Sequence, residues 1–158
     1  MKRAFAIGSA IVLALAAAVQ VRAQSDPGVG TWKLNLAKSK YFARMAPKSE
    51  VRTYAMQGET VKLTDNGVAA DGSSLSWGYI ARLDGKDYPI TGTRPGGADT
   101  ISATLANATT VDAKLKKGGK VIETASRVVS ADGKTLTVTA YSADGNKTPL
   151  FVTVYDKQ

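Results

Sequence analysis

The chain has 158 residues, with 21 Lys and Arg, 13 Asp and Glu, a formal net charge of +8, and neither His nor Cys. The lack of Cys excludes disulfides, thiolate nucleophiles and iron–sulfur clusters, and the lack of His excludes the Ser-His-Asp relay and the common zinc sites. With 44% hydrophobic and 22% charged residues, we expect one globular domain, without a cofactor or a metal site.

The first 23 residues have the pattern of a secretory signal peptide. A basic start is followed by an uncharged, mostly aliphatic run over residues 5–19, and small or apolar residues flank a cleavage site after Ala23. Cleavage there leaves a domain of residues 24–158 that is periplasmic or secreted. An uncleaved anchor is the alternative, although a spanning helix needs about 20 apolar residues. Loss of three basic residues brings the net charge to about +5, too low for a typical nucleic-acid binder.

The rest of the chain alternates apolar and polar residues in short segments, which is the period of half-buried strands. In chain order these segments are 32–36, 51–56, 61–64, 75–81, 101–105, 111–115, 120–130 (less regular), 135–141 and 150–155. Dipeptides that favour tight turns are Asn66-Gly67, Asp71-Gly72, Asp84-Gly85, Gly118-Gly119, Asp132-Gly133 and Asp144-Gly145. We therefore expect eight to ten antiparallel strands.

Two stretches lack this alternation. Residues 37–48 have no two-residue period, and we expect one or two helical turns there before Pro47 ends them. Residues 92–98 are expected to form a loop.

The predicted strand order favours an all-β, antiparallel up-and-down barrel. Short turns connect consecutive strands, and closing the sheet removes the two exposed edges of a long meander. A barrel of about eight strands encloses side chains or one small ligand. A two-sheet sandwich is the competing architecture.

The segment after the signal peptide opens with Gly30-Thr31-Trp32, and Gly-x-Trp on a first strand resembles lipocalins. Four segments, 30–40, 84–92, 127–139 and 154–158, together resemble a largely uncharacterised group of small secreted bacterial lipocalin-like proteins of the calycin superfamily. The resemblance implies a barrel whose base is closed by Trp32. Fatty-acid-binding proteins are similar but end in Arg-x-Tyr, whereas here Thr153 stands at the Arg position and Tyr155 at the Tyr position.

Aromatic residues supply the first candidates for a binding site. Trp32 is expected to be structural, because a large ring buries extensive apolar area. Trp77 and Tyr79 share one face of a strand, where they either line a cavity and contact a ligand or form plain core.

Arg127 is the candidate for an anionic ligand group, since a guanidinium binds a carboxylate with two hydrogen bonds. Tyr155 is the candidate to assist it. Glu123 precedes Arg127 by four residues on the same strand face, so an Arg127–Glu123 ion pair or an outward Arg127 is the alternative.

The proposed role is binding of a small, mostly apolar ligand inside the barrel. The alternative is a barrel with a filled core that acts through its surface as an envelope-associated adaptor or inhibitor. Lys114, Lys116, Lys117 and Lys120 favour such a surface role, because a basic hairpin tip suits an anionic envelope. We expect a monomer without an integral membrane span.

We expect no catalytic residues. The paired candidates Asp65 and Asp71, and Asp84 and Asp87, are expected in turn-forming stretches, where Asp stabilises the turn. Ser73, Ser74 and Ser76 have no local base. An enzyme that uses Tyr, Asp or Arg is the least supported hypothesis.

Overall fold

The computed structural model describes residues 26–158, so the expected signal peptide lies outside the described residues. The elements are β1 Gly30–Leu34, the single 3-10 turn η1 Leu36–Lys38, β2 Lys40–Tyr41, β3 Ser49–Gln57, β4 Thr60–Val68, β5 Ser74–Ala81, β6 Tyr88–Thr93, β7 Thr100–Asn107, β8 Thr110–Lys117, β9 Lys120–Val129, β10 Thr135–Ser142 and β11 Phe151–Lys157. Residues 26–158 contain no helix long and apolar enough to cross a membrane.

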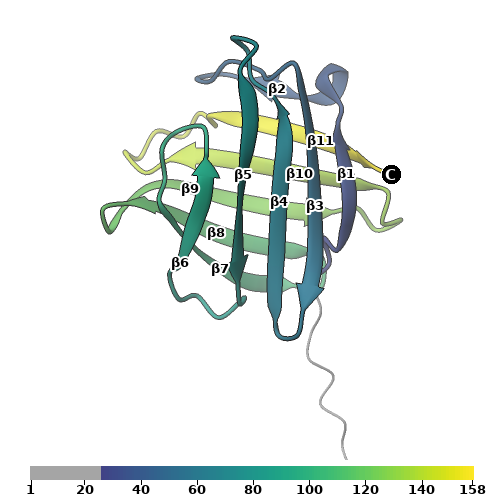
Figure 1. Cartoon of the computed structure of the whole chain (residues 1–158), viewed down its shortest axis with the longest axis vertical. Coiled ribbons are helices and arrows are strands. Elements are labelled where there is room, and N and C mark those ends of the chain that lie inside the picture. The colour runs from purple at the N-terminus through teal and green to yellow at the C-terminus, as the bar shows by residue number, and fades with distance from the viewer. Residues whose placement is uncertain (1–25) are drawn as a thin grey trace, which may run out of the picture.

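All strands belong to one antiparallel sheet that closes on itself (Figure 1). Strands β3 to β11 each pair with the next in sequence, and β1 closes the circle by pairing with β3 and with β11. Across the closing seam, Trp32 lies opposite Lys157 and Leu34 opposite Tyr155. The prediction of an up-and-down barrel is confirmed, with ten strands around the barrel and β2 as a short addition on β11. The sandwich alternative is wrong, because the sheet is continuous.

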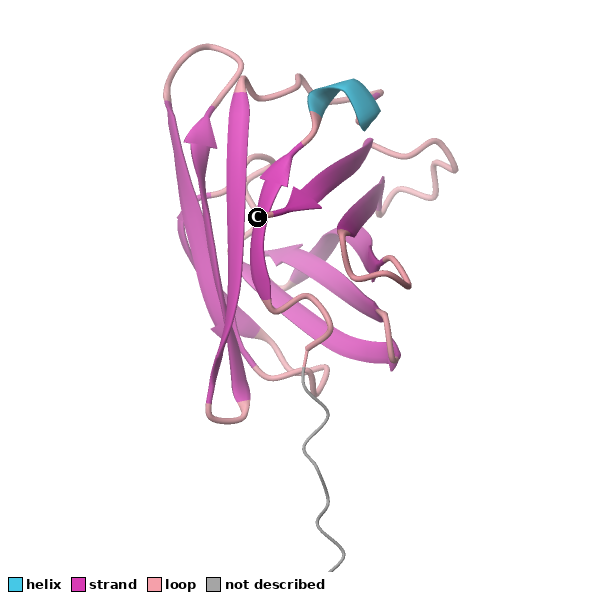
Figure 2. Cartoon of the chain, turned by 90° about the vertical axis from the view of Figure 1, so that its right-hand side faces the viewer, coloured by secondary structure: helices cyan, strands magenta, loops and turns pink. Residues whose placement is uncertain are grey.

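The barrel is flattened into two walls. In Figure 1, β3, β4 and β5 run along the long axis in front, and β8 to β11 cross steeply behind them. Figure 2 shows these walls from the side, with η1 at the upper end. The inward side chains of both walls meet in a core that includes Trp32, Leu136 and Tyr155, none of which is exposed.

Most of the expected turns are found where two strands meet. Gly118-Gly119 connects β8 to β9, and Asp132-Gly133 connects β9 to β10. The expected turn at Asn66-Gly67 is wrong, because Gly67 lies inside β4, between Glu50 of β3 and Leu75 of β5. A side chain at Gly67 would collide with the backbone of β3, so this glycine serves close strand approach. The real hairpin turn between β3 and β4 uses Gly58, which has a φ of 60°.

Residues 37–48 differ from the prediction of helical turns. Only the 3-10 turn η1 and the two-residue β2 form, because the backbone N–H groups of Phe42 and Ala43 bond to Leu150 O instead of to their own segment. The loop expected at residues 92–98 begins two residues late, since β6 extends to Thr93.

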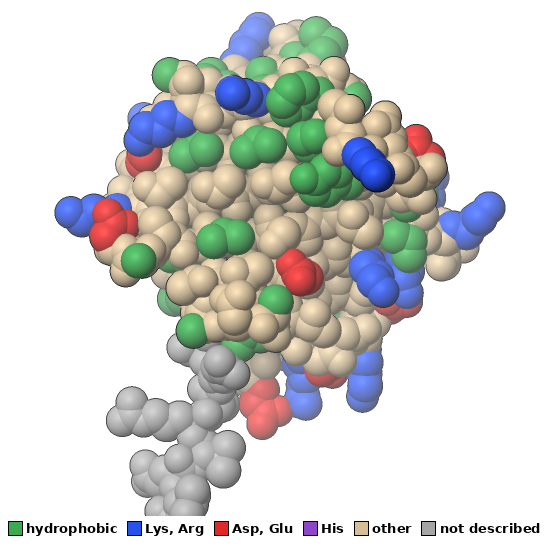
Figure 3. Space-filling model, turned by 180° about the vertical axis from the view of Figure 1, so that it is seen from behind, with side chains coloured by type: hydrophobic (Ala, Val, Ile, Leu, Met, Phe, Trp, Pro, Cys, Tyr) green, Lys and Arg blue, Asp and Glu red, His purple; other side chains and the backbone are tan. Residues whose placement is uncertain are grey.

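The outer surface has an uneven distribution of apolar side chains. Figure 3, which views the molecule from behind, shows hydrophobic side chains gathered with Lys and Arg toward the upper end, above a mostly polar face. That end of the barrel carries η1 and β2 in Figure 1 and Figure 2.

Candidate functional site: a cavity at one end of the barrel

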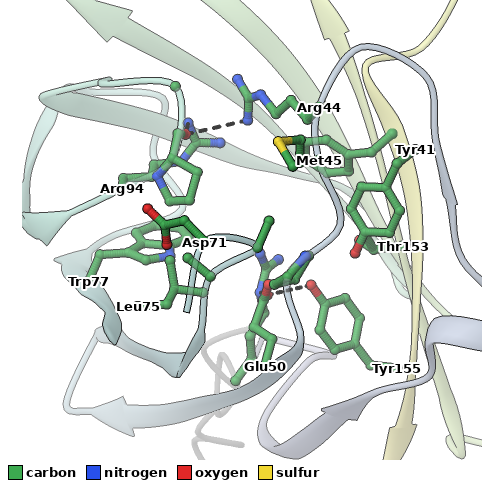
Figure 4. A pocket seen from close by; sticks show the side chains of 17 residues that line it. Tyr41, Arg44, Met45, Glu50, Asp71, Leu75, Trp77, Arg94, Thr153 and Tyr155 are labelled. Carbon is green, nitrogen blue, oxygen red and sulfur yellow. Dashed lines mark hydrogen bonds and ion pairs between the residues drawn. The ribbon is translucent and has the colours of Figure 1, made fainter. Parts of the chain in front are cut away.

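A cavity of about 490 Å³ opens at one end of the barrel (Figure 4). The ends of β3, β5 and β11, the β4–β5 and β6–β7 connections, and residues 41–47 surround it. Its lining residues are Tyr41, Arg44, Met45, Pro47, Glu50, Arg52, Ala69, Ala70, Asp71, Leu75, Trp77, Arg94, Pro95, Gly96, Phe151, Thr153 and Tyr155. The volume lies in the range of small-molecule sites, which is about 300–1,000 Å³.

Apolar and aromatic side chains make most of the cavity wall. Leu75 and Trp77 come from the inward face of β5, and Phe151 and Tyr155 come from the inward face of β11. Because side chains alternate across a strand, residues two or four apart point to the same side. The two-residue period of β5 and β11 therefore places apolar side chains of both strands around the cavity.

The inner part of the cavity contains a buried ionic cluster around Arg52. Its Nε donates to Glu50 Oε1 at 2.7 Å and to Asp65 Oδ2 at 2.8 Å, and the Tyr155 hydroxyl donates to Glu50 Oε1 at 2.5 Å. The guanidinium carbon lies 4.9 Å from the centre of the Tyr155 ring and 5.7 Å from that of the Trp77 ring. The Tyr155 and Trp77 rings of the cavity wall therefore hold Arg52 in place through cation–π contacts.

The two carboxyl groups of this cluster differ in acidity. Burial raises the pKa of Asp65 to about 7, and the nearby Glu50 carboxylate adds to this against the opposing effect of Arg52. For Glu50, burial is outweighed by Arg52 and by the Tyr155 hydroxyl, which lower its pKa. One guanidinium therefore neutralises Glu50 fully, while Asp65 gains or loses its proton near neutral pH.

A second ionic cluster lies where the β6–β7 connection meets residues 41–47. Arg94 Nη2 donates to Glu123 Oε1 at 2.6 Å, and Arg44 Nη2 donates to Glu123 Oε2 at 2.5 Å. The Arg94 guanidinium also lies 5.2 Å from the Trp77 ring centre. The Arg44–Glu123 ion pair therefore holds residues 41–47, which border the cavity, against the inward face of β9.

Two buried polar atoms of cavity-lining residues have no hydrogen-bond partner among residues 26–158: Arg94 Nε and the Tyr41 hydroxyl. Burial raises the pKa of Tyr41 to about 12, so this hydroxyl keeps its proton at neutral pH. Both groups are donors buried beside the cavity, with almost no accessible surface of their own, and an unsatisfied buried polar group is costly.

The sequence-predicted site residues fall into two groups. Trp77 and Tyr155 line the open cavity, whereas Tyr79 and Arg127 line only an inner space of about 60 Å³, of which Trp77 is also a lining residue. Trp32 is fully buried and lines neither space, and its Nε1 donates to Gly28 O at 2.7 Å.

Arg127 points inward, so the alternative of an outward, solvated side chain is wrong. Its Nη2 lies 2.6 Å from both carboxylate oxygens of Asp26, and its guanidinium carbon lies 4.1 Å above the Tyr54 ring. The Arg127–Glu123 pair does not form, because Glu123 binds Arg44 and Arg94 instead. A ligand role for Arg127 and Tyr79 stays a prediction.

Sequence reasoning missed Glu50, Arg52, Asp65 and Arg94. Charged side chains at every second position of β3 indicate a solvent-exposed face. In the structure, however, Glu50 and Arg52 point inward and Val51 is 38% exposed. The available signal was the pairing partner, since Asp65 lies directly opposite Arg52 on β4. That register runs through Asp65 inside β4, whereas the expected turn at Asn66-Gly67 placed Asp65 in a turn-forming stretch, which is wrong. Among residues 26–158, no group of three or more acidic side chains is arranged to hold a metal ion.

No protein-family model matches the sequence, and no curated protein matches it. Among the solved structures that resemble the fold are the following two. Zebrafish ileal bile acid-binding protein, complexed with cholic acid, has a TM-score of 0.53 and 12% identity, covering 84% of this chain and 99% of that one. Rv2717c from M. tuberculosis has a TM-score of 0.51 and 15% identity, covering 84% and 93%. The shared fold is a closed, antiparallel up-and-down β-barrel. At these identities the likeness establishes the barrel architecture and nothing about the ligand.

Proposed function

We propose that the protein binds a small, largely apolar molecule in the cavity beside Trp77. The observation that carries this proposal is a space of about 490 Å³ with aromatic walls at an open end of the barrel. An apolar ligand loses its hydration shell on entering such a preformed space, which is the main favourable term in binding.

Titration with Nile red, a neutral apolar fluorophore, tests this proposal. Wild-type protein is expected to bind the dye with a blue shift of its emission. Leu75→Trp fills the cavity and is expected to raise the dissociation constant about tenfold or more. Ile80→Trp makes the same type of change on the outer face of the same strand, where Ile80 is 49% exposed, and is expected to leave binding unchanged.

Thermal unfolding of both variants controls for loss of fold. A wild-type protein that binds neither Nile red nor any co-purifying small molecule in native mass spectrometry contradicts the proposal. That outcome favours the alternative, in which the barrel acts through its surface as an adaptor or inhibitor.

We further propose that the protein is a monomeric binding protein without enzymatic activity, that residues 1–23 are a signal peptide, and that it works in the periplasm or outside the cell. The basic, apolar and small-residue order of residues 1–23 supports export. Membership of the small secreted bacterial lipocalin-like group is proposed on the four matching segments. Mass spectrometry of protein recovered from the periplasm of an expressing cell tests export: a chain that begins at Gln24 is expected, and an uncut chain contradicts it.

A further inference from the structure

Residues 36–48, here named the cap segment, expose three large apolar side chains. Leu36 is 44% exposed, Phe42 53% and Met45 81%, and Met45 has the highest exposure among the large exposed hydrophobic side chains of residues 26–158. Because folding normally buries such side chains, their concentration in one short segment indicates an interaction surface.

The cap segment is also strongly basic. It carries Lys38, Lys40, Arg44 and Lys48, and it contains no acidic residue. Lys38 pairs with Asp156 and Arg44 with Glu123, whereas Lys40 and Lys48 take part in none of the ion pairs found within residues 26–158. Basic side chains and exposed apolar side chains are thus intermixed along the whole cap segment.

The cap segment borders the cavity, since Tyr41, Arg44, Met45 and Pro47 belong to its lining. Figure 4 shows Arg44 and Met45 at the rim. In Figure 3, apolar and basic side chains intermingle at the same end of the molecule. Whatever covers the cap segment therefore lies next to the opening of the cavity.

We propose that the cap segment docks on an anionic lipid bilayer, with Phe42 and Met45 inserted between the head groups and Lys40 and Lys48 on lipid phosphates. A bilayer interface accepts both kinds of side chain at once, because apolar groups enter the acyl boundary while cations stay with the phosphates. The core of a protein–protein interface is instead depleted in Lys. Docking in this orientation presents the cavity opening to the membrane.

A site-specific probe tests the contact. Phe42→Trp is expected to shift its emission to the blue, and to be quenched by brominated acyl chains, when the full chain meets phosphatidylcholine vesicles containing phosphatidylglycerol. Ile80→Trp, on the outer face of β5, is the matched control and is expected to show neither effect. Trp32 and Trp77 also emit in every variant, so the signal of residue 42 is the difference between Phe42→Trp and the wild-type chain, and binding through another part of the chain does not produce this difference. Equal responses at both sites, or none at residue 42, overturn the proposal.

Charge reversal tests the electrostatic part. Lys40→Glu with Lys48→Glu is expected to lower the partition coefficient on the anionic vesicles about tenfold or more. The matched pair Lys114→Glu with Lys120→Glu makes the same charge change at the β8–β9 hairpin and is expected to have a smaller effect. A larger effect from the hairpin pair contradicts docking through the cap segment and supports the hairpin tip instead. Nile red binding to the Lys40→Glu, Lys48→Glu variant reports on the cavity independently.

Discussion

Arg52 decides the character of the cavity at the scale of single residues. Its Nε serves Glu50 and Asp65 together, and two aromatic rings cover its faces. Asp65 is completely buried, and its Oδ1 has no hydrogen-bond partner in the described part of the chain. One guanidinium between two carboxyl groups leaves one negative charge in excess, which the cluster avoids by holding a proton on Asp65.

The proton that folding holds on Asp65 makes the stability of the protein depend on pH. The pKa of Asp65 rises from 3.8 to about 7 on folding, so the folded chain holds this proton more tightly than the unfolded chain. The contribution of Asp65 to the unfolding free energy is therefore greatest at low pH and falls as the pH rises from about 4 to about 7. One unit of pKa shift corresponds to about 1.4 kcal/mol, so we expect a fall of more than about 1 kcal/mol.

Asp65→Asn removes the titrating group while keeping an acceptor for Arg52. Urea unfolding at about pH 5 and about pH 8 is expected to show a loss of stability in the wild type and a much smaller one in this variant. Asp71→Asn, at an exposed turn, is the matched control and is expected to keep the wild-type slope. An unchanged slope in Asp65→Asn contradicts the assignment of the proton.

At the scale of elements, β6 is the weakest member of the barrel. Four register pairs join it to β5, from Ser76 opposite Thr93 to Tyr79 opposite Ile90, but only two join it to β7. The same element was missed from the sequence, because Pro89 and Gly92 are rare inside strands. The residues of β6 do not predict a strand, but β6 forms one because it pairs with the neighbouring strand β5.

Amide hydrogen exchange is expected to reflect this difference. Protection should be at least about tenfold lower in β6 than in β3 and β4, which pair along nine positions, because unpaired backbone opens locally at low cost. Equal protection in β6 and β4 would contradict this weakness. Because the following loop carries Arg94, exchange in β6 also reports on how firmly one side of the cavity is held.

At the scale of the whole molecule, the Arg127–Asp26 pair joins two parts of the chain 101 residues apart. Both side chains are buried, and Gly28 leaves the space in which the Arg127 guanidinium lies. The pair thus binds the segment that precedes β1 to the inner face of β9, beside the Trp32 indole that bonds to Gly28 O.

Breaking this pair is expected to destabilise the barrel without changing the cavity. Arg127→Met leaves Asp26 buried without a counter-charge and should lower the unfolding free energy by about 3–5 kcal/mol. Adding Asp26→Asn should restore part of the loss, and this double variant should bind Nile red as the wild type does, since Arg127 does not line the cavity. A loss of dye affinity in the folded double variant would instead support the prediction that Arg127 contacts the ligand.

The sequence by itself determined the all-β class and most of the hairpins, because these depend on a two-residue alternation and on local turn chemistry, and it favoured a closed barrel over a sandwich. It also placed Trp77 on an inward face, whereas on the last strand it indicated Val152 and Val154 as the apolar face and the structure instead buries Tyr155. Only the tertiary structure decided which inward side chains surround open space and which are paired across the barrel. Alternation shows that Glu50, Arg52 and Tyr54 share a face, but their partners Asp65, Tyr155 and Arg127 come from other strands. Such contacts depend on register and closure, which join residues far apart in the chain and which no local pattern encodes.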